Sequence, residues 1–125
     1  VLKRLSSADK KVYLVLGNPV GMDFDPLKQI EGSRLGRMHV SDQGKAPLPE
    51  DQAQFNPRLK QVPEANGAQV IEPFASLCAE GQCIRSMPDD GSPAYKDIGH
   101  LRPRYARSFA TYMDPALLDE SASGK

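Results

Sequence analysis

Five apolar residues in a row, Val12-Tyr13-Leu14-Val15-Leu16, predict a fully buried β-strand near the start of this chain. Before the run, apolar residues at positions 1, 2, 5 and 8 fit the last turns of an amphipathic helix. After it, Gly17-Asn18-Pro19 ends the strand. A helix, a strand and then a loop form half of a βαβ unit, so the order predicts a parallel sheet.

The same order recurs in the middle of the chain. Residues 49–62 read as a second helix that Pro57 must start, kink or split, with Phe55, Leu59 and Val62 on one face. Asn66-Gly67 is a turn signal, and residues 68–73 read as a second short strand. A third helix is expected over residues 101–112, before a polar tail from Asp114 onward. The chain is therefore expected to have an α/β fold.

Composition narrows the functional classes. The 125 residues carry 16 Lys and Arg against 16 Asp and Glu, so a zero net charge gives no electrostatic reason to expect nucleic acid as a partner. No run approaches the roughly 18–20 apolar residues of a transmembrane helix. Because the first residue is Val, we expect the chain to be a piece of a longer protein.

The only two cysteines, Cys78 and Cys83, flank a short loop that contains Gly81. Cysteines this close can form a small disulfide ring, or they can be two free thiols of a reducing compartment. A zinc site is not expected, because no second Cys or His pair follows at finger spacing. No metal or cofactor is predicted.

An acid and an imidazole lie three residues apart in Tyr95-Lys96-Asp97-Ile98-Gly99-His100-Leu101. In a tight turn, Asp97 can hold one ring nitrogen of His100 while the other nitrogen acts as a general base. The alternative is an Asp that caps the final helix beside an exposed histidine. His39, the only other histidine, has basic and apolar neighbours and no adjacent carboxylate, so we interpret it as a surface residue.

The last third of the chain carries a resemblance. A Cys pair, a Gly-containing turn, Tyr95-Lys96-Asp97-Ile98-Gly99-His100-Leu101 and then a helix resemble the C-terminal part of the SGNH hydrolase-like domain fused to acyltransferase-3 membrane O-acyltransferases of bacteria. The resemblance implies a flavodoxin-like three-layer α/β/α sandwich with a parallel sheet, with Asp97 and His100 as acid and base. It also implies a Cys78–Cys83 disulfide and a periplasmic location on an inner-membrane protein.

The implied chemistry is acyl transfer to, or ester hydrolysis from, a carbohydrate hydroxyl of the cell surface. O-acetyl is the expected acyl group, and an acyl donor and a carbohydrate acceptor are the expected ligands. The family's Gly-Asp-Ser nucleophile segment does not occur in this sequence. We therefore expect residues 1–113 to be the C-terminal portion of the domain and residues 114–125 to be a tail. The serine would then come from preceding polypeptide that includes a membrane acyltransferase domain, and the fragment alone would be inactive.

Gly17-Asn18 resembles the family's oxyanion block, although the Asp that follows there is missing, so Asn18 is the candidate oxyanion residue. Two other hypotheses stay open. One is a non-catalytic periplasmic domain that binds glycan. The other is a small cytosolic domain in which Asp97 and His100 only cap a helix.

Overall fold

The computed structural model describes residues 1–41 and 43–118. Its parallel sheet has two strands, β1 (Tyr13–Val15) and β5 (Gln69–Ile71), with Tyr13 opposite Gln69. A short helix, α1 (Leu2–Ser7), precedes β1, and the long helix α2 (Glu50–Ala65) precedes β5. The predicted order of helix and strand is therefore confirmed in both halves, and the two strands are neighbours.

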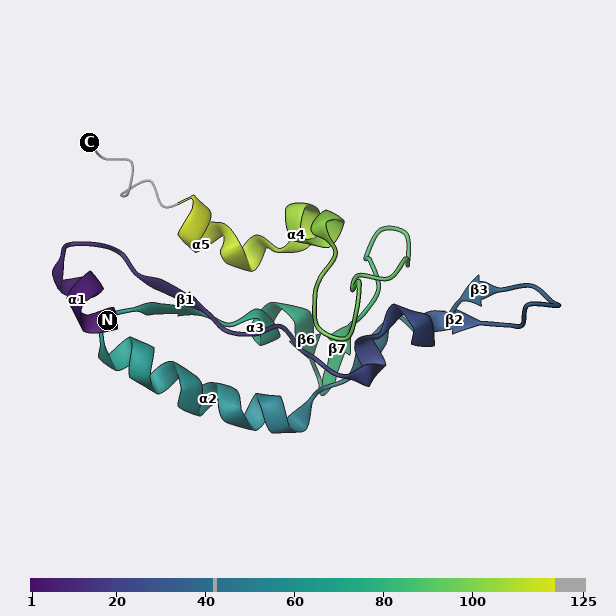
Figure 1. Ribbon diagram of the computed structural model, residues 1–125, viewed down its shortest axis with the longest axis horizontal. Coiled ribbons are helices and arrows are strands. Elements are labelled where there is room, and N and C mark those ends of the chain that lie inside the picture. Colours follow the sequence, from purple (N-terminus) through teal and green to yellow (C-terminus); the bar gives the residue numbers. More distant parts are fainter. Residues whose placement is uncertain (42, 119–125) are drawn as a thin grey trace.

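Helices lie on both sides of this small sheet (Figure 1). Helix α2 runs along one side, and the C-terminal helices α4 (Pro103–Phe109) and α5 (Asp114–Leu117) run along the other. The fold is mixed α/β with a small parallel sheet, and the described residues do not form the complete three-layer sandwich that the sequence predicts. No helix among the described residues is long and apolar enough to cross a membrane.

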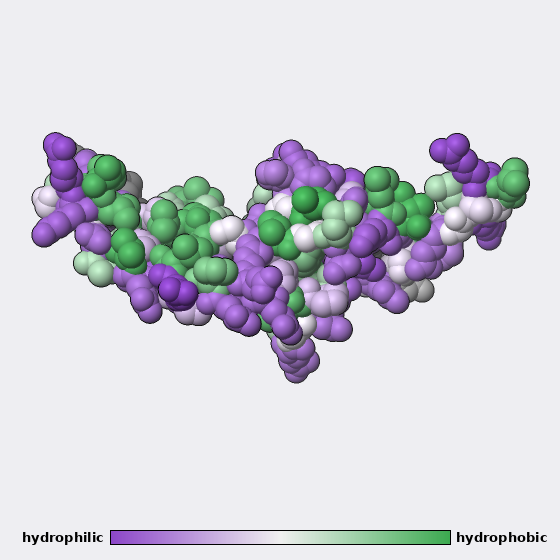
Figure 2. Space-filling view, turned by 60° about the horizontal axis from the view of Figure 1, so that its bottom comes forward, coloured by the Kyte–Doolittle hydropathy of each residue, from purple (hydrophilic) through white to green (hydrophobic). Residues whose placement is uncertain are grey.

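One expectation about burial is wrong. The first strand is not fully buried, because Val15 is 43% exposed. Beside β1 only β5 is hydrogen-bonded, and Val15 faces an open cleft. Helix α2 passes through Pro57 without interruption, yet its predicted apolar face is more than half exposed at Phe55, Leu59 and Val62. Figure 2 looks onto this side and shows apolar surface among hydrophilic residues.

A second, antiparallel sheet lies beside the first. Its order is β4 (Lys45–Pro47), β7 (Gln82–Ile84) and β6 (Cys78–Ala79), and the short helix α3 (Pro73–Leu77) leads from β5 into it. Cys78 and Cys83 are opposite each other in the hairpin and form a disulfide. The main buried cluster of side chains packs here and under the C-terminal helices; it includes Phe24, Leu77, Cys83, Met87, Tyr95 and Tyr105.

A two-stranded hairpin projects from this body, formed by β2 (Ile30–Glu31) and β3 (His39–Val40) (Figure 1). It follows two 3-10 turns, Met22–Phe24 and Pro26–Gln29. Asp25 caps the second turn by accepting the backbone N–H of Leu27 at 2.9 Å, as Pro26 at the first helical position predicts. All four hairpin residues are exposed, so the hairpin is not part of the core.

The C-terminal segment is shorter in its helix and more ordered in its tail than expected. Helix α4 ends at Phe109 and a 3-10 turn covers Thr111–Met113. Asp114 begins α5 rather than a frayed end, because it occupies the first helical position with Pro115 next to it. Residues 119–125 of the predicted tail lie outside the described residues.

Candidate active site

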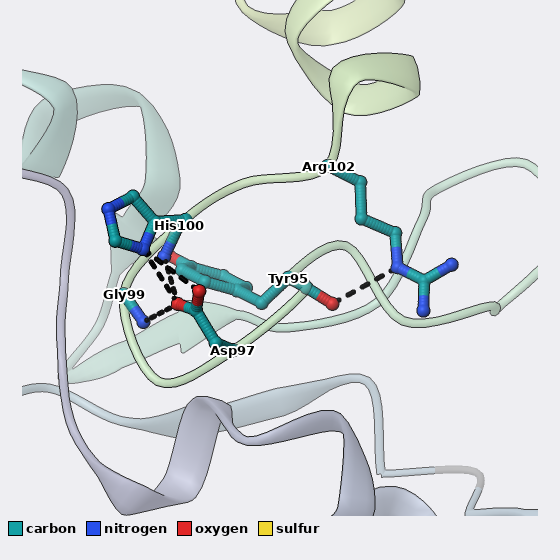
Figure 3. Close-up of polar contacts among 5 residues, drawn as sticks. All are labelled: Tyr95, Asp97, Gly99, His100 and Arg102. Carbon is teal, nitrogen blue, oxygen red and sulfur yellow. Dashed lines mark hydrogen bonds and ion pairs between the residues drawn. The ribbon is translucent and has the colours of Figure 1, made fainter.

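The loop between Tyr95 and Leu101 brings an acid and an imidazole into contact. One oxygen of Asp97, Oδ1, accepts the backbone N–H groups of Gly99 at 3.0 Å and His100 at 2.8 Å. This local turn brings the side chains of Asp97 and His100 together. Nδ1 of His100 then lies 2.9 Å from both carboxylate oxygens of Asp97, and Nε2 is on the far side of the ring (Figure 3).

The hydrogen bonds to Asp97 favour its ionised form. The backbone N–H groups of Gly99 and His100, followed by the His100 ring, lower the pKa of Asp97 to about 2. Asp97 is therefore ionised at neutral pH. An ionised carboxylate beside Nδ1 selects the tautomer with the proton on Nδ1, which leaves the lone pair on Nε2. This is the arrangement of a general base held by a carboxylate.

The loop rests on the main core through Tyr95. The Tyr95 side chain is completely buried, and its ring lies 4.9 Å from that of Phe24. The backbone N–H of Lys96 donates to the carbonyl of His100 at 2.9 Å and closes the loop. Arg102 donates from Nε to the carbonyl of Tyr95 at 3.1 Å (Figure 3). The acid–imidazole pair is thus exposed, but the backbone that carries it is fixed from below.

The residues after β1 support the loop from the other side. Gly21 donates its N–H to the carbonyl of Ile98 at 2.9 Å. A Cβ at Gly99 would come within 2.7 Å of Cγ1 of Val20, so only glycine lets the two loops approach this closely. The loop at the carboxyl end of β1 therefore contacts the acid–imidazole loop directly.

His100 forms part of the wall of a cleft of about 700 Å³. The cleft lies between the end of β1, the acid–imidazole loop and the C-terminal helices. Its walls include Val15, Asn18, Lys96, His100, Arg107 and Tyr112. The structure therefore brings Asn18 and His100 to one cleft, although 82 positions separate them in the sequence (100 − 18 = 82).

Sequence reasoning missed two residues that hold Asn18. Gln52 on α2 donates from Nε2 to the Asn18 carbonyl at 2.7 Å and accepts the N–H of Val20 at 3.1 Å. Tyr112 lies with its hydroxyl 3.5 Å from Oδ1 of Asn18. Contact with Oδ1 leaves the amide nitrogen of Asn18 as the group for a ligand oxygen. No sequence signal marks Gln52, and the sequence marks Tyr112 only as the last residue of the expected third helix.

A family model now adds to this geometry. The model of the SGNH domain fused to AT3 domains matches residues 1–115, which is most of the chain. The chain belongs to the SGNH domain family. None of the curated proteins and none of the solved structures gives a significant match. The resemblance that the sequence showed in its last third is thereby confirmed, and it extends back through both parallel strands.

Family membership gives the Asp97–His100 contact a chemical context, because the family is one of esterases and acyltransferases. The predicted Cys78–Cys83 disulfide is present, which fits a domain outside the reducing cytoplasm. Within residues 1–41 and 43–118, no three His, Cys, Asp or Glu side chains gather as metal ligands.

His39 is a surface residue, as the sequence predicts, but it has a carboxylate partner that its neighbours in the sequence do not reveal. Pairing of β2 with β3 puts Glu31 opposite His39, and Nε2 of His39 lies 3.3 Å from the Glu31 carboxylate. The sequence hid this contact because the two residues are eight positions apart (39 − 31 = 8). His39 is on the projecting hairpin and is not among the residues that form the His100 cleft.

One serine of this SGNH domain lies at the cleft. Ser108, on the exposed side of α4, contributes to the same wall as His100. It has no Gly-Asp-Ser context, in which the family carries its nucleophile. Any test of the site must therefore separate Ser108 from a serine supplied by preceding polypeptide.

Proposed function

We propose that this domain transfers or hydrolyses O-acyl groups, above all O-acetyl, of bacterial cell-surface polysaccharide. Its Ser-His-Asp triad would combine His100 and Asp97 with a serine from polypeptide that precedes Val1. The observation that carries the proposal is the contact of Nδ1 of His100 with both oxygens of Asp97 at 2.9 Å, on the wall of a cleft. Membership of the SGNH family supports the same chemistry.

In this proposal His100 is the general base. Nε2 takes the proton of the serine hydroxyl while the serine oxygen attacks the acyl carbonyl. The leaving alcohol then receives that proton from His100, and an acyl-serine remains. An acceptor hydroxyl, or water, attacks the acyl-serine in the second half of the reaction, and His100 again takes and returns one proton. Asp97 acts as the positioning residue that stabilises the imidazolium.

Asn18 is the proposed donor to the developing oxyanion. Its amide nitrogen is free to face the cleft while Tyr112 contacts its Oδ1 and Gln52 holds its backbone. Such a donor stabilises the tetrahedral intermediate because its dipole is already oriented before the reaction begins. The same cleft carries Asn18 and His100, which is the juxtaposition that this role requires.

We further propose that preceding polypeptide completes the domain. Strands added beside β1 and β5 would extend the two-stranded sheet into the three-layer sandwich, with residues 1–113 as its C-terminal portion. Parallel sheets are ordinarily covered on both faces, and Val15 is exposed on this one. The domain would be on the periplasmic side of the inner membrane and would work with an acyltransferase domain of the same protein. The disulfide supports the compartment.

The test uses the full-length protein in cells that make the polysaccharide. His100→Ala should lower the O-acetyl content or its turnover by roughly 10²–10⁴-fold, the usual contribution of a general base. His39→Ala is the matched control on the other histidine, and Ser108→Ala controls for a nucleophile on α4. Both should retain activity. Loss of activity with Ser108→Ala would place the nucleophile on α4. O-acetyl content and turnover that His100→Ala leaves unchanged would favour a non-catalytic glycan-binding domain.

A further inference from the structure

The cleft beside His100 has two cationic side chains that its chemistry leaves unused. Lys96 precedes Asp97 in the acid–imidazole loop, and Arg107 is on the exposed face of α4. Both side chains contribute to the same cleft walls as His100 and Asn18. They therefore come from two different elements of the cleft wall, the acid–imidazole loop and α4.

Neither cation is neutralised within the described residues. By contrast, Arg104 of the same helix is paired: its guanidinium nitrogens lie 2.6 Å from carboxylate oxygens of Asp89 and Asp90. Among residues 1–41 and 43–118, no carboxylate comes within 4.0 Å of Lys96 or Arg107. The charge of these two side chains is thus available to a ligand.

Among the described residues, two carboxylates line or adjoin the cleft. Asp97 is committed to His100 and to two backbone N–H groups. Asp114, at the start of α5, is also part of the cleft wall and carries one negative charge. Among the described residues that line the cleft, two cations stand against Asp114, so the lining carries one excess positive charge, while the ionised Asp97 adjoins the cleft without lining it.

We propose that the cleft selects an acceptor glycan that carries a sugar carboxylate, with Lys96 and Arg107 as the groups that bind it. This inference rests on the proposed function, because it identifies the substrate class of the same site. A guanidinium matches a carboxylate with two parallel hydrogen bonds, and an ammonium adds a mobile charge. The half-buried Tyr112 and Val15 offer apolar wall for the face of the sugar ring.

Binding to the full-length protein is measured by saturation-transfer NMR. The probes are trisaccharides of galacturonate, glucuronate and sialic acid, and their carboxyl-reduced neutral counterparts. At least one acidic probe should bind roughly tenfold more tightly than its neutral counterpart, and added salt should weaken it. Lys96→Gln and Arg107→Gln should each weaken that probe about three- to fivefold, as expected for exposed ion pairs. Binding of the neutral counterparts should not change.

The control is Arg58→Gln, which removes an exposed cation of α2 that does not line the cleft and should leave all binding unchanged. Equal binding of acidic and neutral probes, or no binding of any acidic probe, overturns the inference. So does equal displacement of the acidic probe by inorganic phosphate, which would indicate a general oxyanion site. Loss of O-acetylation with His100→Ala alongside any of these results would sink the inference but keep the proposed reaction.

Discussion

The described residues form two histidine–carboxylate contacts, and these differ in the structure that surrounds them. His100 meets Asp97 at 2.9 Å, and His39 meets Glu31 at 3.3 Å; both imidazoles are mostly exposed, at 76% and 63% of their side-chain surface. Asp97 is also bound by two backbone N–H groups, above a completely buried tyrosine and beside a cleft. Glu31 and His39 pair across a hairpin of four exposed residues.

The difference shows what a candidate site needs beyond an acid and a base. A catalytic pair must be held in one geometry before substrate arrives, because reorganisation during the reaction costs rate. The Asp97 loop supplies that restraint through its backbone and through Tyr95. The hairpin supplies an ion pair of the kind that contributes little at a surface.

The largest contrast should come from removing the carboxylates. Asp97→Asn keeps the shape of the loop but replaces the negative charge beside Nδ1, so His100 loses its fixed tautomer and its counter-charge. We expect acyl turnover to fall by roughly 10²–10⁴-fold, as for the acid of other triads. Glu31→Gln should change turnover less than twofold. The rate of O-acetyl turnover by the full-length protein measures both variants, and equal losses would remove the distinction between the two contacts.

The second largest contrast should be in how much the residues that pack under each contact contribute to stability. Tyr95→Ala deletes a buried ring that packs on Phe24, and large aromatic deletions in cores cost about 3–5 kcal/mol of unfolding free energy. Val40→Ala, on the hairpin and 42% exposed, should cost less than about 1 kcal/mol. Pulse proteolysis of the full-length protein in urea measures the unfolding free energy. A small cost for Tyr95→Ala would mean that the loop does not depend on the core.

A third, smaller contrast should come from adding a methyl group at a glycine of each loop, because the acid–imidazole loop lies close to Val20. A methyl group at Gly99 would meet Cγ1 of Val20 at 2.7 Å, so Gly99→Ala must shift the acid–imidazole loop or the Val20 side chain. We expect about a tenfold loss of turnover, because small displacements of a catalytic group reduce rate strongly. Gly36→Ala in the hairpin meets only the side-chain oxygen of Ser33 at 3.3 Å and should have no effect on turnover. Undiminished turnover of Gly99→Ala would show that the loop tolerates the shift.

The sequence predicted those parts of the site that depend on neighbours along the chain. Asp97 and His100 are three residues apart, so one turn joins them, and the Cys78–Cys83 pair closes a single hairpin. The order of helices and strands likewise followed from apolar periodicity. Contacts between distant segments could not be predicted in this way. Glu31 beside His39 depends on strand pairing, and Gln52 beneath Asn18 depends on how α2 packs.

The exposure of apolar side chains also could not be predicted from the local sequence pattern. The run from Val12 to Leu16 is as apolar as a buried strand, but Val15 faces the cleft. The stripe of Phe55, Leu59 and Val62 has the period of a packed helix face, but the described residues leave it uncovered. Periodicity states which residues share a face, and only the tertiary structure states whether anything covers that face. The exposure of this stripe therefore follows from the tertiary structure and not from the sequence pattern.

The smallest contrast should appear at low pH, where Asp97 becomes protonated. Because the folded pKa of Asp97 is about 2, below the ordinary 3.8, its hydrogen bonds stabilise the loop fully above about pH 3.8. That contribution is lost as the pH falls through about 2, when the carboxyl is protonated. NMR should show the amide signals of Gly99 and His100 shifting together between pH 3.8 and 2, with no shift in Asp97→Asn. The amide signal of His39 should not follow that transition, because Asp97 bonds only within its own loop. A transition of the Gly99 and His100 amides centred near pH 4 would show that the backbone does not hold Asp97, and the two contacts would then be alike.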